Sequence, residues 1–498
     1  MVPLKRRKVS SSTGGASTSD SRDDASKFPQ VVLFLLERKM GTSRRHFLTE
    51  LGRKKGFRVD ESFTENVTHV ISEKNSGDEV KSWLSSQGHD PTAAHLVDIR
   101  WLTESLSAGC PLDILQQHRL MERPASSGDE TATFSMPIYA CQRRTTLDHR
   151  NAVFTEALSL LAENAELSQD EGRAVAFRRA AATLKAFPEP LTDARQLRGC
   201  PCLGQHSLSV IQDILENGSS REVEATRRSE RFKAMKLLTA IFGVGAKTAA
   251  QWFQEGIRNL PQLHQSGRVL TRAQQAGVAH YDDLTQSVTR AEADTIGQIV
   301  EEAVGAKLPS ARVTLVGGFR RGKLSGHDVD FLITHPEEGR EEGLIPKVVA
   351  HLEARDFLLY HKNNRNSYTE ASGTPASTMD HFERCFSIFK LPMPEGGEPH
   401  SRQDDVALRR GECRRWRAVR VDLVVCPFSQ FAFALLGWTG SKLFERELRR
   451  WATQQKNMSL SSHALYDNKQ RKYLKAATEE EIFAHLSLEY IPPSERNA

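Results

Sequence analysis

The chain has 498 residues, which is more than one hydrophobic core usually serves, and this length predicts roughly three or four domains. A formal net charge of +5 excludes a strongly acidic protein and suits nucleic acid as a partner. No apolar run of about 18 residues occurs, so no membrane span is expected. The seven cysteines show no framework spacing, which indicates free thiols in a reducing compartment.

The first 27 residues are small, polar and charged, and we expect them to be disordered. They begin with the basic cluster PLKRRKVS, which no apolar core follows, so it is not a secretory signal. A nuclear localisation signal is the functional interpretation, and a solvated chain end is the alternative.

Residues 28–121 have the pattern of a compact α/β domain. VVLFLLE, FRV and THVIS predict strands, and SRRHFLTELGRKKG predicts an amphipathic helix that buries Phe47, Leu48 and Leu51. DIRWLTESLSAG predicts a closing helix with Trp101 in the core. This order of elements resembles a BRCT domain. The first helix also carries the basic side chains Arg44, Arg45, Arg53, Lys54 and Lys55. They form either a solvated face or a contact surface for DNA or an acidic partner.

A linker is predicted at residues 122–140, and two helical regions are predicted at 141–230 and 231–286. LRGCPCLGQHSLSVIQDIL and FGVGAKTAAQWFQEG each place glycines between two helical patterns. Both resemble helix-hairpin-helix motifs, which offer backbone N–H groups to a DNA phosphate. In the second motif, Gly243 and Gly245 permit the hairpin and Lys247 opens the following helix.

The segment GGFRRGKLSGHDVDFLI, residues 317–333, contains two carboxylates at a spacing of i and i+2. On a strand, Asp328 and Asp330 project from one face, where their repulsion calls for a cation such as Mg²⁺. VRVDLVV places Asp422 in a second apolar strand. The segment also fits the P-loop spacing GxxxxGK, but Leu324 stands where that motif needs Ser or Thr. A glycine-rich hairpin with ordinary turn aspartates is the structural alternative.

We expect a catalytic domain at residues 287–426, interrupted by polar insertions at 361–380 and about 393–415. The first insertion has almost no apolar anchor, so we expect a mobile loop that can stand in for missing template. A last domain is predicted at 427–498, where Gly437 and Gly440 precede a helix. That helix is expected to bury Phe444, Leu448 and Trp451 and to present Lys442, Arg446 and Arg449 on another side.

Together these motifs resemble the family X DNA polymerases over nearly the whole chain. The resemblance implies a multidomain α/β fold: a BRCT-like domain, a helical 8-kDa-type domain with helix-hairpin-helix motifs, then fingers, palm and thumb with a mixed sheet carrying three Asp. It implies transfer of a nucleotide to a primer 3′-OH by Asp328, Asp330 and Asp422, which hold two Mg²⁺ ions that Mn²⁺ can replace.

The resemblance also implies the binding residues. Those for the triphosphate and nucleotide are Gly317, Gly318, Arg321, Lys323, His327, Gly437, Trp438 and Lys442. Those for DNA are Arg173, His206, Gly243, Gly245, Lys247, Arg384, Arg449 and His463. Backbone carbonyls of Thr239, Ile241 and Val244 would hold a monovalent cation. Val210 stands where lyase-active relatives have a nucleophilic Lys, and Ser461 stands where an Asn contacting the minor groove is expected.

Gly437 and Trp438 replace the Tyr-Phe pair of repair members of the family, and a missing Tyr would admit ribonucleotides. This pair is shared by template-directed end-joining members and untemplated terminal transferases; other segments favour the former. The implied role is gap filling in end joining of double-strand breaks and in V(D)J recombination. The implied partners are the Ku heterodimer and the end-joining ligase complex, in the nucleus, for a monomeric enzyme. A non-catalytic BRCT scaffold is the rival hypothesis, and the three Asp argue against it.

Overall fold

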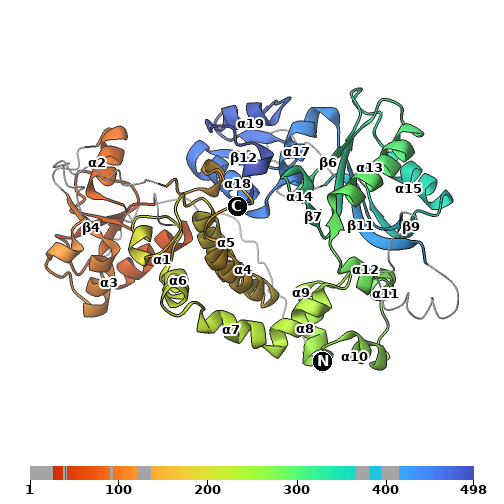
Figure 1. The fold of residues 1–498 in the computed structure, drawn as a ribbon. Coiled ribbons are helices and arrows are strands. Elements are labelled where there is room, and N and C mark those ends of the chain that lie inside the picture. The colour runs from red at the N-terminus through yellow and green to blue at the C-terminus, as the bar shows by residue number, and fades with distance from the viewer. Residues whose placement is uncertain are drawn as a thin grey trace, which may run out of the picture. The chain divides into compact units, whose positions relative to one another are not determined.

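The computed structural model describes residues 26–37, 40, 42–73, 75–89, 94–120, 136–365, 381–393 and 414–498. The predicted tail before residue 26, most of the first palm insertion (366–380) and most of the second (394–413) therefore lie outside the described residues. The chain divides into two compact units, Met1–Thr133 and Phe134–Ala498 (Figure 1). No described helix has the length and apolar character needed to cross a bilayer.

The first unit is a parallel four-stranded sheet in the order β2-β1-β3-β4. Its strands and helices are β1 Val32–Leu35, α1 Thr42–Lys54, β2 Arg58–Asp60, β3 His69–Ser72, α2 Gly77–Ser86, β4 His95–Asp98, α3 Ile99–Ala108 and η2 Gln116–His118. Side chains of the strands point alternately to the two faces of the sheet and form two cores. One core contains α1 and α3, and the other contains α2. Figure 1 shows this unit in orange, with α2 and α3 on opposite sides of the strands.

Trp101 is a core residue of the first unit, as predicted, and its Nε1 donates to the Leu112 carbonyl at 2.8 Å. The prediction for Phe47 was wrong, because its side chain is 63% exposed on α1 while Leu48 is buried. Adjacent helical residues can both be buried, as Trp101 and Leu102 are on α3, so the packing of α1, and not its local pattern, leaves Phe47 exposed. Acidic neighbours pair with part of the basic face: Arg44 lies 3.0 Å from Glu73 and Arg45 lies 2.9 Å from Glu37.

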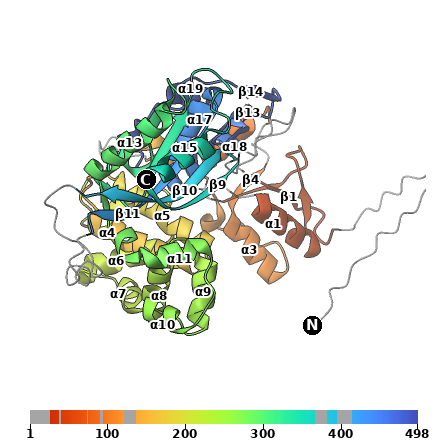
Figure 2. The same ribbon diagram turned by 90° about the vertical axis from the view of Figure 1, so that its right-hand side faces the viewer.

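The second unit begins inside the range predicted as a linker, since Met136 and Tyr139 are both buried in its cores. Its helical part has one core and comprises η3 Ala140–Gln142, α4 Ala152–Leu167, α5 Glu171–Lys185, η4 Ala194–Leu197, α6 Gln205–Asn217 and α7 Arg221–Arg228. A second helical group has its own core and comprises α8 Glu230–Thr239, α9 Ala246–Gln254, α10 Leu260–Gln265, α11 Arg272–Ala279 and α12 Tyr281–Leu284. Figure 2 shows α8 to α11 gathered together.

The palm is a mixed five-stranded sheet in the order β6-β8-β11-β10-β9. Its elements are β5 Val288–Thr289, α13 Arg290–Gly305, β6 Arg312–Leu315, α14 Gly317–Arg320, β7 Ser325–Gly326, β8 Val329–Thr334, α15 Leu344–Ala354, β9 Leu358–Asn364, β10 Glu383–Pro392 and β11 Trp416–Val425. β8 and β11 are parallel, and β9 and β10 are antiparallel neighbours. The polar insertion predicted at 361–380 begins later than expected, because residues 361–364 are the end of β9, which pairs antiparallel with β10.

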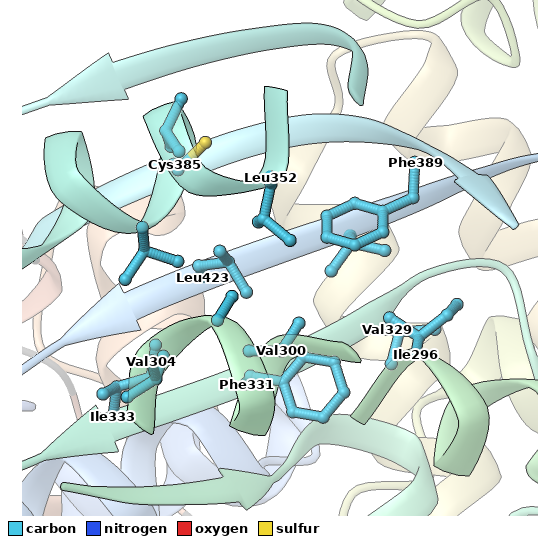
Figure 3. Packing of buried hydrophobic residues seen from close by; sticks show 14 of the residues in the cluster. Ile296, Val300, Val304, Val329, Phe331, Ile333, Leu352, Cys385, Phe389 and Leu423 are labelled. Carbon is cyan, nitrogen blue, oxygen red and sulfur yellow. The ribbon is translucent and has the colours of Figure 1, made fainter. Parts of the chain in front are cut away.

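One face of the palm sheet is covered and the other is partly open. Val329, Phe331 and Leu423 pack with α13 and α15 in a core that Figure 3 shows from close by. The alternate residues Leu332 and Val424 face the other way, against α17. Strand side chains alternate between the two faces of a sheet. Residues of the second face that lie outside the part covered by α17 can therefore form a site.

The last part comprises η5 Phe428–Gln430, α17 Phe431–Thr439, α18 Lys442–Lys456, β12 Met458–Leu460, β13 Leu465–Asp467, β14 Lys472–Leu474, α19 Glu479–His485 and η6 Pro493–Glu495. Phe444 and Leu448 of α18 are fully buried, as predicted, and Trp451 packs beside them. On another side of α18, Glu447 is 0% exposed and accepts two hydrogen bonds from Arg179 of α5, at 2.6 and 2.8 Å. This ion pair joins the last part to the helical part.

Candidate active site

Two of the three predicted carboxylates are direct neighbours in the palm sheet. Asp330 of β8 and Asp422 of β11 are paired in the parallel register, and Asp328 precedes β8 by one residue. All three face away from α13 and α15, since their neighbours Val329, Phe331 and Leu423 point into that core. The sheet therefore brings together the three carboxylates that the sequence predicted.

Arg420 is a member of this cluster that the sequence analysis did not identify. Its Nη2 lies 2.8 Å from Asp422 Oδ2, and its Nη1 lies 3.8 Å from Asp328 Oδ2. In the described part of the chain, no three His, Cys, Asp or Glu side chains lie arranged to hold a metal ion as they stand. The Arg420 guanidinium lies between Asp328 and Asp422 and supplies positive charge to both. The alternation of β11 could have revealed it, because Arg420 precedes Asp422 by two residues.

Burial is the main reason, and repulsion between the carboxylates a smaller one, why the ionised forms of Asp330 and Asp422 are disfavoured. Burial, followed by the charges of Asp328 and Asp422, raises the pKa of Asp330 to about 8. Burial also raises the pKa of Asp422, although Arg420 opposes the shift. Three carboxylates that favour a shared positive charge are the oxygen donors that a hard divalent cation prefers. The residues present therefore fit a divalent metal.

The glycine-rich segment lies directly beside these carboxylates. Gly317 has φ +63°, and a Cβ there would lie 2.5 Å from Asp330 Oδ2, so only glycine permits this approach. Lys323 packs across Gly318, where a Cβ would lie 3.1 Å from its Cδ. Arg321 donates from Nε to Asn497 Oδ1 at 3.1 Å and from Nη1 to the Thr439 carbonyl. The segment thus gathers a basic side chain and backbone at the carboxylate cluster.

The predicted sugar-contacting position, Gly437, lies against Ser462. A Cβ at Gly437 would lie 2.7 Å from Ser462 Oγ, which accepts a hydrogen bond from Arg449 at 3.2 Å. Trp438 is half-buried and packs with Leu332 and neighbouring residues at the end of the sheet. This packing restricts the movement of the Trp438 ring, which the resemblance places at the nucleotide.

Lys442 opens α18 with its side chain 80% exposed and pairs with Glu166 of α4 at 3.2 Å. His463, which the resemblance implied as a DNA contact, lies inside the fold. Its side chain is 1% exposed, and its ring bonds to Gln430 Oε1 at 2.8 Å and to the His381 amide at 3.0 Å. Ser461 is also buried and accepts two backbone N–H groups within its own turn. Contacts within the fold therefore hold both side chains in place.

A cavity of about 1250 Å³ lies between the α8–α9 hairpin and the palm. His327, Asp328 and Arg420 line its palm side, and the three predicted cation-binding positions Thr239, Ile241 and Val244 line the other. Gly243 lines the cavity at φ +82°, and a Cβ there would lie 2.9 Å from Ala273 Cβ. Gly245 caps α9, in which Lys247 is exposed. Arg384 of β10 is half-buried, stacked over Phe386 at 5.3 Å, on the same sheet.

A separate cluster forms in the helical part. Arg173 Nη2 lies 3.4 Å from His206 Nδ1, so the structure brings these two predicted DNA contacts together. Glu222 of α7 was not predicted, yet it lies 2.6 Å from His206 Nε2 and 3.3 Å from Arg173 Nη2. Val210, the position of the missing lysine, is 3% exposed and belongs to the apolar core.

Models of known families match successive parts of the chain in this order. They are the BRCA1 C Terminus (BRCT) domain at residues 24–106, a helix-hairpin-helix domain at 149–220, the fingers domain of DNA polymerase lambda at 236–285, the DNA polymerase beta palm at 287–392 and the DNA polymerase beta thumb at 434–497. A relative from Homo sapiens, DNA-directed DNA/RNA polymerase mu, is 49% identical and the match covers 100% of both chains. This chain belongs to the family X DNA polymerases.

The polymerase is also similar to two proteins named DNA nucleotidylexotransferase. The one from Bos taurus is 46% identical over 97% of this chain and 96% of its own length. The one from Homo sapiens is 44% identical over 99% of this chain and 98% of its own length. The predicted fold class is confirmed in each of its parts, from the BRCT domain to the mixed palm sheet. Family X polymerases use divalent metal ions, and the carboxylate cluster of this polymerase is the place that fits them.

Proposed function

We propose that this polymerase fills gaps by adding nucleotides to a primer 3′-OH under the direction of a template. The register pairing of Asp330 with Asp422, with Asp328 on the same face and Gly317 directly beside them, is the observation that supports it most. The human relative's name describes a DNA-directed DNA/RNA polymerase, which agrees with templated synthesis from either sugar. The proposed setting is end joining of double-strand breaks and V(D)J recombination.

In the proposed mechanism, Asp328, Asp330 and Asp422 would hold two Mg²⁺ ions, or Mn²⁺ in their place. These ions would supply a lowered pKa for the 3′-hydroxyl and compensation for the charge of the leaving pyrophosphate. Gly317 and Gly318 let the backbone approach the triphosphate. The cationic side chains Arg321, Lys323 and His327 bind its oxygens. Arg420 supplies positive charge to Asp422 and Asp328.

The DNA is held on both sides of the gap. Arg173 and His206 bind the 5′-phosphate, without lyase chemistry because Val210 offers no amine. The α8–α9 hairpin binds the primer strand through backbone groups around Gly243 and Gly245, with a monovalent cation at the Thr239, Ile241 and Val244 carbonyls. Lys247, Arg384 and Arg449 add phosphate or groove contacts, while Gly437, Trp438 and Lys442 border the nucleotide.

The BRCT-type unit is proposed to recruit the polymerase to broken ends through the Ku heterodimer and the end-joining ligase complex. Its own two cores allow it to fold by itself, and Phe47 is exposed on α1 beside basic side chains. An exposed large aromatic residue next to cations is typical of a protein-binding surface. The basic cluster at the start of the chain is proposed to direct the polymerase to the nucleus.

Primer extension on a gapped duplex tests the central proposal. We expect the inserted nucleotide to follow the template base when each of the four bases is placed in the gap. Template-independent transfer is the second candidate, which the two nucleotidylexotransferase relatives favour. Insertion that ignores the template base, with equal extension of a single strand, would establish transfer and refute templated gap filling.

A further inference from the structure

Asn497 connects three parts of the second unit, and its side chain is 5% exposed. Its backbone N–H donates to the Thr145 carbonyl at 3.0 Å, and its own carbonyl accepts Lys185 Nζ at 2.9 Å. Its side-chain Nδ2 donates to the Ser494 carbonyl at 2.9 Å. The main chain of Asn497 is thus fixed against the helical part, and its amide is fixed against the turn before it.

The same amide forms hydrogen bonds with both the side chain and the main chain of Arg321. Asn497 Oδ1 accepts a hydrogen bond from Arg321 Nε at 3.1 Å, and Asn497 Nδ2 donates to the Arg321 carbonyl at 3.3 Å. Arg321 Nη1 in turn donates to the Thr439 carbonyl. Two fixed points define the plane of a guanidinium, because the group is rigid and planar. Asn497 and Thr439 therefore set the direction in which the remaining N–H groups of Arg321 point.

The surroundings of Arg321 are cationic. Burial, followed by the charges of Lys323 and Arg321, lowers the pKa of Lys185. Burial also lowers the pKa of Arg321, which Asp330 opposes. Cations that approach one another in a desolvated place repel, so each needs a neutral acceptor that holds it in position. The amide and carbonyl of Asn497 provide such acceptors for both Arg321 and Lys185.

We propose that Asn497 is a positioning residue for triphosphate binding: it orients Arg321 toward the incoming nucleotide and braces the glycine-rich segment against the helical part. The proposal rests on the proposed function, in which Arg321 binds the triphosphate. The new element is that Asn497, a residue distant from Arg321 in sequence, determines how tightly Arg321 binds the triphosphate. A binding group displaced by about 1 Å can lose much of its effect, which is why a bracing amide matters.

The test measures triphosphate affinity apart from turnover. Asn497→Ala should raise KM for the templated nucleotide roughly tenfold and change kcat less, because a hydrogen bond to a charged group is lost. The Kd of a non-hydrolysable triphosphate on a dideoxy-terminated gapped duplex should rise equally. Asn468→Ala is the matched control: its amide bonds the Asn457 carbonyl at 2.9 Å in the same subdomain, so KM should not change.

A double-mutant cycle separates positioning from a merely structural role. Arg321→Ala should raise KM, and Asn497→Ala added to it should raise KM no further. If Asn497→Ala does not fold, Asn497→Asp keeps the shape but loses the Nδ2 donor, and it should still raise KM. Unchanged KM in the folded variant, or independent effects in the cycle, would overturn the proposal. The carboxylate variants should lose activity whatever the result for Asn497. The proposed function and the role of Asn497 can therefore fail separately.

Discussion

Arg420 Nη2 lies 2.8 Å from Asp422 Oδ2, and both side chains project from the same face of β11. The guanidinium supplies positive charge to the carboxylate cluster. It contacts Asp422 closely and approaches Asp328 only to 3.8 Å, so it compensates the two carboxylates unequally.

Removal of a carboxylate should stop the chemistry and leave DNA binding intact. Asp330→Ala or Asp422→Ala should lower kcat by about 10³ or more, roughly 4 kcal/mol of barrier. Binding to a gapped duplex, which phosphate contacts elsewhere dominate, should barely change. Asp294→Ala is a suitable control, since Asp294 is an exposed palm residue that pairs with Arg290 at 2.8 Å. Near-normal extension by either cluster variant would rule out the assignment.

The raised pKa of Asp330, about 8, predicts a pH dependence of stability in the metal-free protein. An unfolded Asp titrates near pH ~4, so the folded chain binds this proton more tightly than the unfolded chain. The free energy of unfolding should therefore fall as pH rises from about 4 to about 8. Asp330→Asn should raise Tm at pH 8 by a few degrees, where ~1 kcal/mol corresponds to ~2–4 °C.

Thermal unfolding in a chelator at pH 5 and pH 8 checks this. The difference in Tm between Asp330→Asn and the unmodified protein should nearly vanish at pH 5, because Asp330 is then protonated and resembles Asn. A difference of the same size at both pH values would show that the carboxylate is not held neutral by its surroundings.

Glu222 should compete with the 5′-phosphate for Arg173 and His206, which it contacts at 3.3 and 2.6 Å. Glu222→Gln should increase the preference for a 5′-phosphorylated gap over a 5′-hydroxyl gap by about two- to fivefold, the scale of an exposed ion pair. Arg173→Ala with His206→Ala should abolish the preference. Fluorescence anisotropy on both duplexes measures it, with Glu224→Gln on the same helix as control. A weaker preference in Glu222→Gln would contradict the competition.

Gly437 should leave room for a ribose, so ribonucleotides should enter within about tenfold of deoxyribonucleotides, since no side chain is present to repel the 2′-hydroxyl. Gly437→Tyr alone should impair both sugars, because its Cβ would lie 2.7 Å from Ser462 Oγ. Gly437→Tyr with Ser462→Ala should restore deoxyribonucleotides and reject ribonucleotides. Ser462→Ala alone reports the cost of losing the Arg449 hydrogen bond. Strong rejection of ribonucleotides by the unmodified polymerase would contradict this explanation.

Removal of residues 1–120 should leave gap filling intact and abolish assembly with Ku on a DNA end. Phe47→Ala should reproduce that loss, because its side chain is 63% exposed on the proposed surface. Leu115→Ala, at a position 55% exposed in the same unit, should not. Gel-shift assembly on a short duplex with purified Ku measures all three. Loss of gap filling after the truncation would mean that the unit belongs to the catalytic fold.

The sequence by itself determined the elements whose signal is local. A strand pattern with carboxylates at i and i+2 puts Asp328 and Asp330 on one face whatever surrounds them, because strand side chains alternate. The glycine hairpin at Gly243 is also a local signal, because its backbone takes φ +82°, which favours glycine. The same local logic failed for Phe47, because an apolar residue type does not decide whether packing covers its side chain.

Only the tertiary structure decided which distant residues meet. The register of β8 with β11 pairs Asp330 with Asp422, and no local pattern specifies a register between strands so far apart in the chain. The placement of Glu222 at the Arg173–His206 pair, of Ser462 against Gly437 and of Asn497 on Arg321 likewise depends on how separate elements pack. His463 is buried for the same reason: its polar side chain finds its partners, Gln430 and His381, within the fold. Local sequence specifies which face a side chain takes, and long-range packing specifies what it faces.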